Sequence, residues 1–115
     1  MSDQKKYLTA EDILAVKDIV TVEVDVPEWG GIVRLRSMSG EEAVTYVEML
    51  AKDKSSAAVK AVLMCAVKED GTRLFTEEQL SVLKQKSLRA INRIQNVALE
   101  INGLRDEEAK KTKND

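Results

Sequence analysis

The alternation of apolar and polar residues near the N-terminus predicts a pair of strands. Between residues 20 and 26, valines alternate with polar residues, which is typical of a strand with one buried face. Pro27 ends this segment because proline has no N–H to donate to a strand ladder. After a short connection, Val33 and Leu35 alternate with arginines. We therefore expect a second strand over residues 32–37 and an antiparallel hairpin.

The rest of the chain has the three- and four-residue apolar spacing of helices. A Ser or Thr precedes each helical segment, where its side-chain oxygen can accept a backbone N–H of the first turn. The pattern therefore predicts a predominantly α-helical α+β fold, with five helices and one hairpin near the N-terminus. The expected helices cover residues 10–16, 40–52, 57–68, 77–84 and 88–104, with caps at Thr9, Ser39, Ser55 or Ser56, Thr76 and Ser87.

The third predicted helix is the expected centre of the core. Residues 57–67 are apolar on almost every side, with Cys65 as a small core residue. Because a two-stranded hairpin is marginal alone, we expect it to pack against this helix and to bury Val62 and Leu63. The residues predicted to face inward from the other helices are Ala43, Val44, Val47, Leu50 and Ala51, then Leu80, Val82 and Leu83, then Leu88, Ile91, Ile94, Ala98 and Ile101.

The ends of the chain differ in composition from its centre. Residues 1–6 are polar, and residues 105–115 contain no apolar side chain larger than Ala. Such segments cannot bury enough apolar surface to offset the entropy of ordering. We therefore predict one globular domain over residues 7–104, with a disordered N-terminus and a charged disordered tail.

Composition excludes several classes of function. The 115 residues include no histidine and one cysteine, so the commonest acid–base group, Cys-based zinc sites and internal disulfides are missing. The net charge of −2 gives no bulk attraction to phosphates. The most apolar run, 57–67, contains Lys60 and is too short to span a bilayer. We predict a soluble cytoplasmic protein that is not an enzyme and takes no cofactor or metal.

Two local patterns suggest binding sites that the sequence does not favour. An EF-hand loop with Gly71 at its sixth position would need ligands at Ala66 and Lys68, which cannot coordinate calcium. A stripe of Arg89, Asn92, Arg93 and Asn96 along the last helix resembles a DNA-recognition face, and such side chains read bases. The acidic balance of the domain favours a polar or partner-facing surface instead, so we do not expect nucleic acid binding.

The segment 7–16 is the main candidate for contact with another chain. Its helix is too short to be stable alone, so its apolar residues must bury against its own domain or against a neighbouring subunit. The sequence leaves these two alternatives open. Trp29, between Pro27 and two glycines, is either a binding anchor or a lid over the hairpin. The candidate association residues are Leu8, Ile13, Leu14, Val16, Trp29, Arg89 and Arg93.

Three ordered motifs resemble the tail assembly chaperones of long-tailed (siphovirus) phages. The first is the valine strand running into Val26-Pro27-Glu28-Trp29-Gly30, and the second is Met38-Ser39-Gly40-Glu41-Glu42 at a helix start. The third runs from Val67 to Ser87 and contains an Asp-Gly turn, Leu74-Phe75 directed to the core and a Thr76–Gln79 capping box. Together they cover most of residues 20–104.

The resemblance implies a non-enzymatic helper that binds the tape measure protein while tail tube subunits polymerise around it. It also implies a homo-oligomer of spiral form that acts in the host cytoplasm and is absent from the mature virion. The rival interpretations are a small nucleic-acid-binding regulatory protein and a structural tail or connector component. The family carries no fixed catalytic or ligand residues over to this chain.

Overall fold

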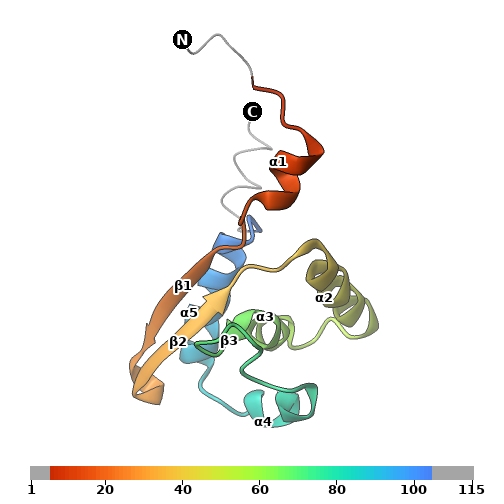
Figure 1. Cartoon of the computed structure of the whole chain (residues 1–115). Coiled ribbons are helices and arrows are strands. Elements are labelled where there is room, and N and C mark those ends of the chain that lie inside the picture. The colour runs from red at the N-terminus through yellow and green to blue at the C-terminus, as the bar shows by residue number, and fades with distance from the viewer. Residues whose placement is uncertain (1–5, 105–115) are drawn as a thin grey trace, which may run out of the picture.

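The structure is a computed structural model that describes residues 6–104. The predicted disordered N-terminus, except Lys6, and the predicted charged tail lie outside the described residues. Three antiparallel strands, β1 (Thr21–Val26), β2 (Gly31–Arg36) and β3 (Ala66–Val67), form one sheet in the order β1-β2-β3 (Figure 1). The predicted hairpin is confirmed, with bounds shifted by one residue.

A tight turn joins the strands of the hairpin. Pro27–Trp29 form a 3-10 turn, η1, and Gly30 follows at φ 74°, in the left-handed region that glycine enters without steric cost. The valines of β1 that face the core alternate with exposed residues, as the sequence predicts. The cross-strand pair Glu23–Arg34 forms at 3.4 Å, whereas Arg36 binds Glu42 on the next helix at 2.6 Å.

Five helices complete the fold and confirm the predicted α+β class. The Ser39 and Ser87 side chains cap their helices by accepting the N–H of Glu42 and Ala90. A 3-10 turn, η2, precedes the fourth helix. The bounds are α1 (Ala10–Ala15), α2 (Gly40–Lys52), α3 (Ala57–Cys65), η2 (Glu77–Gln79), α4 (Leu80–Leu83) and α5 (Leu88–Ile101).

One core joins the sheet to α3 and α5. Val62 and Leu63 are fully buried, as predicted for the central helix. α5 packs against both strands of the hairpin, while α3 packs against α5, α2 and α4. The segment 57–67 meets the hairpin directly at β3, where Ala66 and Val67 pair with β2, and the rest of the segment shares the core with the hairpin. The core residues of the sheet are Val24, Val26, Val33 and Leu35, and those of α5 are Ala90, Ile91, Ile94 and Ala98.

The predicted end of the third helix is wrong. The helix stops at Cys65, and Ala66 and Val67 become β3, which pairs with Leu35 and Arg34 of β2. Gly71 at φ 90° then reverses the chain. Pairing with β2 gives hydrogen-bond partners to the N–H and C=O groups along its edge, which a longer helix would leave unpaired. This tertiary contact therefore overrides the helical pattern of the sequence.

Several residues predicted to face inward are exposed instead. The buried face of α2 is centred on Tyr46, which leaves Val44 and Val47 exposed. In α4 the inward residues are Leu80 and Leu83, and Val82 projects outward because it lies about half a turn from Leu80. Leu88 is exposed at the first position of α5. Ser56 precedes α3 with φ 64° and makes no side-chain cap, contrary to expectation.

Candidate partner-binding surfaces

The N-terminal segment, residues 7–16, which we call the strap, forms its predicted helix without burying any side chain. A capping box starts α1: the Thr9 N–H donates to Asp12 Oδ2 at 3.0 Å and the Asp12 N–H donates to Thr9 Oγ1 at 3.1 Å. Leu14 is 84% exposed and Ile13 is 54% exposed. Local hydrogen bonds therefore hold the helix, and its apolar side chains remain open to a partner.

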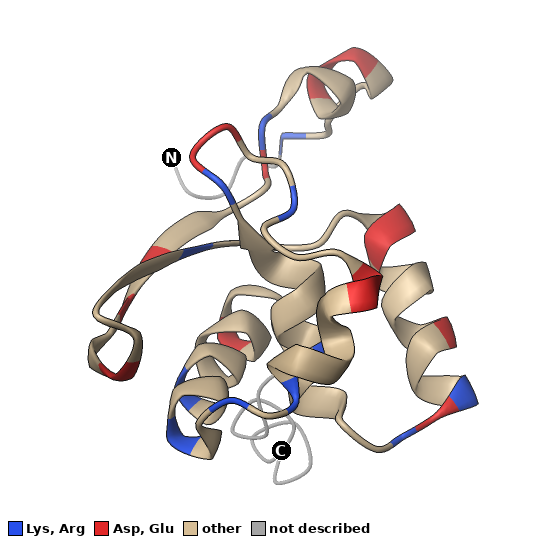
Figure 2. Ribbon diagram, turned by 90° about the horizontal axis from the view of Figure 1, so that it is seen from below, with Lys and Arg blue, Asp and Glu red and all other residues tan. Residues whose placement is uncertain are grey.

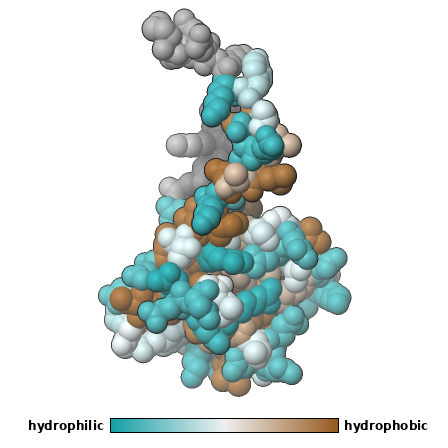
Figure 3. Space-filling view, viewed as in Figure 1, coloured by the Kyte–Doolittle hydropathy of each residue, from teal (hydrophilic) through white to brown (hydrophobic). Residues whose placement is uncertain are grey.

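The strap projects from one end of the domain (Figure 1). Residues 17–20 connect the strap to β1, and Ile19 and Val20 among them are also exposed. Val20 is fixed to Ser37, since its N–H donates to Ser37 Oγ at 2.9 Å and its carbonyl accepts the Ser37 N–H at 2.8 Å. Hydrophobic residues are visible on this projecting part in the space-filling view (Figure 3). The result is a projecting segment with several exposed apolar side chains and a fixed point of departure.

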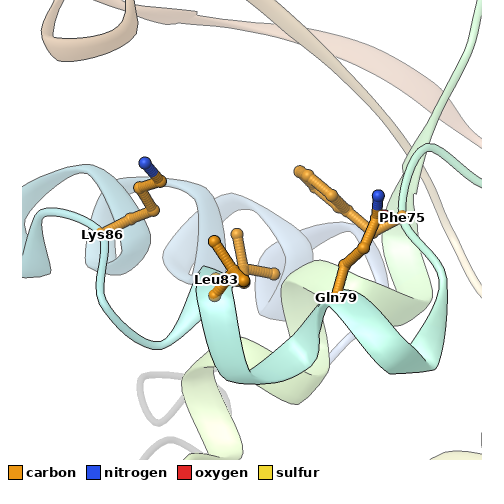
Figure 4. Close-up of a pocket in the computed structure, with 5 residues that line it drawn as sticks. Phe75, Gln79, Leu83 and Lys86 are labelled. Carbon is orange, nitrogen blue, oxygen red and sulfur yellow. The ribbon is translucent and has the colours of Figure 1, made fainter.

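A second apolar surface lies beside α4, and we call it the α4 groove. Phe75, Gln79, Val82, Leu83 and Lys86 line a hollow of about 210 Å³. Leu83 forms its buried floor, and the Phe75 ring lies along one side (Figure 4). The short α4 brings these residues together because η2 and the turn before α5 bend the chain at both of its ends.

Trp29 extends the α4 groove toward the hairpin. It lines an adjoining hollow of about 330 Å³ together with Phe75, Leu83 and Lys86. Trp29 is half-buried against the core, as a lid would be, and its remaining exposed surface borders the groove. Phe75 packs on the core as predicted, but Leu74 stays 38% exposed.

An ion pair fixes the hairpin turn to α5. The Arg93 guanidinium donates to both carboxylate oxygens of Glu28, with Nη2 to Oε2 at 2.8 Å. These bidentate bonds from Arg93 are the main reason that the pKa of Glu28 falls to about 2. Since the two residues are 65 positions apart, the pair closes a long loop and positions Trp29 at the groove.

The Glu28→Gln variant should lose stability at neutral pH and lose less of it in acid. A carboxylate with a lowered folded pKa stabilises the fold above its unfolded pKa of 4.5, and this contribution disappears as pH falls through about 2. We expect the difference in melting temperature between wild type and variant to shrink between these pH values. Thermal unfolding followed by circular dichroism measures it. Glu78→Gln, at an exposed position of η2, is the control, and an equal pH dependence of both variants would contradict the role of Glu28.

The polar stripe of α5 is less available to phosphates than its sequence suggests. Arg89 and Arg93 lie together on one shallow hollow with Asn92 and Asn96. However, the Arg93 guanidinium is occupied by Glu28. Positive and negative residues are also interspersed over the described elements (Figure 2). The stripe therefore lacks the uniform positive charge of a nucleic acid interface.

The structure brings the sequence-predicted association residues to two separate places. Leu8, Ile13, Leu14 and Val16 all lie on the strap, whereas Trp29, Arg89 and Arg93 lie on the hairpin turn and α5. Their role in association stays a prediction. Sequence reasoning missed Gln79 and Lys86 as groove residues. The spacing of Gln79, Val82 and Lys86 could have placed them together on the rim, because residues three or four apart share a helix face.

The described residues offer neither a metal site nor a membrane span. Within residues 6–104, no group of three or more His, Cys, Asp or Glu side chains could hold an ion. Asp70, which precedes Gly71, accepts the N–H and hydroxyl of Thr72 in a turn at 2.9 and 2.7 Å. No helix in this part of the chain is long and apolar enough to cross a membrane.

The arrangement of the hairpin, the third strand and the helices is similar to that in a solved structure of the bacteriophage HK97 tail assembly chaperone, with a TM-score of 0.58 and 22% sequence identity. The match covers 79% of this chain and 90% of that one. No family model and no curated protein match the sequence. The likeness establishes the fold and agrees with the resemblance found in the three sequence motifs.

Proposed function

We propose that this protein is a non-enzymatic tail assembly chaperone that binds a tape measure protein and assists tail tube polymerisation through self-association. The observation that carries the proposal is the agreement of two independent lines of evidence. The fold is similar to that of a tail assembly chaperone, and the chain exposes a strap of apolar side chains at one end of a stable domain.

The exposed surfaces suit a chaperone for a long helical client. A tape measure protein outside its tube presents apolar stripes that must be shielded from water. Helix-in-groove and apolar contacts of modest area can shield such stripes and still be displaced. Many weak contacts, repeated along an assembly of chaperone subunits, hold the client by avidity rather than by one tight site.

The lack of bulk positive charge agrees with a protein client. The net charge is −2, and the arginine pair on α5 is partly neutralised by Glu28. Electrostatic attraction to nucleic acid would require a basic face. We therefore place the action of this protein in the host cytoplasm during tail assembly, with tape measure and tail tube proteins as partners.

Co-expression with the tape measure protein of the same phage tests the proposal. An affinity-tagged chain should keep the tape measure protein in the soluble fraction and co-purify with it. Addition of the tail tube protein should release the tagged chain, because tube subunits replace it around the client. Mass spectrometry of purified virions should not detect the chain. A tape measure protein that remains insoluble, or a chain that is abundant in virions, would contradict the proposal.

A further inference from the structure

The strap and the α4 groove lie at opposite ends of the molecule. In Figure 1, α1 projects beyond one end of the sheet, while α4 and the hairpin turn lie at the other end. Trp29 borders the groove at this second end. An apolar segment and an apolar groove therefore face away from each other within one chain.

The strap cannot reach the groove of its own chain. Val20 is held to Ser37 by hydrogen bonds on both its N–H and its carbonyl, so only residues 16–19 are free to bend. These residues, fully extended, span at most about 14 Å. The strand β1 spans about 20 Å, and Trp29 lies beyond its far end. A strap folded back along its own sheet would leave Ile13 and Leu14 short of the groove.

The two surfaces are complementary in chemistry. The groove is lined mainly by apolar side chains, and Lys86 is the charged residue of its lining. The helix of the strap presents Ile13 and Leu14 together with two acidic residues, Glu11 and Asp12. A short amphipathic helix with acidic groups beside its apolar residues is the class of ligand that fits such a groove.

We propose that the α4 groove of one copy binds the strap of a second copy. This inference rests on the proposed self-association and specifies its two halves. The contact is head-to-tail, because the strap and the groove are different surfaces at different ends. Repetition of such a contact produces a ring if the rotation closes and an open helical chain if it does not. Each subunit then supplies one strap and receives one.

Full-length charge variants separate the two halves of the contact. Leu14→Glu disables the strap at a position that is 84% exposed, and Val82→Glu disables the groove at a position that is 60% exposed. Neither change touches the core, so both chains should fold. Val47→Glu, at a 61% exposed position on α2, is the matched control. Light scattering across a concentration series gives the mass, and circular dichroism checks the fold of each variant.

The expected result is complementation. The Leu14→Glu and Val82→Glu chains should each associate at least about tenfold more weakly than wild type, since each loses the burial of one aliphatic side chain. Mixed together, they should form a heterodimer that does not grow, because one intact groove meets one intact strap. The emission of Trp29, the only tryptophan, should shift in the mixture and not in either variant alone. The Val47→Glu control should associate like wild type.

Other outcomes overturn the inference in distinguishable ways. If Leu14→Glu weakens association but Val82→Glu does not, the strap binds elsewhere and the groove assignment fails. A shift of Trp29 emission that is independent of concentration would mean that the strap binds its own chain. If the wild-type chain is monomeric throughout, self-association itself fails and the proposed chaperone mechanism fails with it. Retention of the tape measure protein by the Val82→Glu chain would separate client binding from subunit contact.

Discussion

Replacement of Leu63 by Ala should lower the free energy of unfolding by ~2–5 kcal/mol. Leu63 is fully buried in α3, the helix that packs against α2, α4 and α5, so the cavity cannot be filled by movement of one neighbour. Natural domains are stable by only about 5–15 kcal/mol, so a loss of this size threatens the fold. Urea unfolding measured by circular dichroism gives the change.

The control for this experiment is Val47→Ala on α2. Val47 is exposed, so its truncation should change stability by no more than about 0.5 kcal/mol. A Leu63→Ala variant as stable as the control would mean that α3 is not the centre of the core. Equal slopes of the two unfolding curves would show that both variants unfold from the same compact state.

Periodicity predicted the elements of this fold better than their contacts. The alternating valines and the capping residues identified the hairpin and all five helices, because these signals are local. The conversion of Ala66 and Val67 into a strand was not visible, since it depends on a free edge of β2 that only the folded sheet provides. Nor did the sequence show that α5 packs against both strands of the hairpin, because that contact joins residues far apart in the chain.

The sequence predicted one of the two candidate surfaces, the strap, but not the α4 groove. The strap could be identified because an apolar segment too short to be a stable helix must find a partner. The α4 groove could not, because it combines Trp29 with residues near position 80, which are distant in sequence. Nothing in the sequence indicates that Glu28 binds Arg93, since each residue alone looks like an ordinary surface charge.

The proposed contact between strap and groove would make assembly independent of folding. None of the strap residues belongs to the core, so the domain does not depend on the strap for stability. A subunit can therefore remain folded while its strap is free and can exchange neighbours without unfolding. Reversible contacts of this type suit the proposed function, in which the chaperone leaves when tube subunits arrive.

Lys60 is expected to be the most sensitive charged residue of the chain. It is 4% exposed within α3, and its Nζ donates to the main-chain carbonyls of Met49, at 3.4 Å, and Asp53 at the end of α2. The Asp53 carboxylate lies 3.8 Å away. Lys60 thus supplies a donor to the Asp53 carbonyl just after α2 and a second donor to the Met49 carbonyl, which also accepts the Asp53 N–H.

Two substitutions of Lys60 should separate its polar role from its packing. Lys60→Met keeps a long aliphatic side chain and removes the donor, so we expect a loss of about 1–3 kcal/mol for the unsatisfied carbonyl. Lys60→Ala also removes the buried stem and should cost more than Lys60→Met. Thermal and urea unfolding measure both, with the exposed Lys54→Met as control. If Lys60→Met were as stable as wild type, the bonds to α2 would add nothing beyond the packing of the stem.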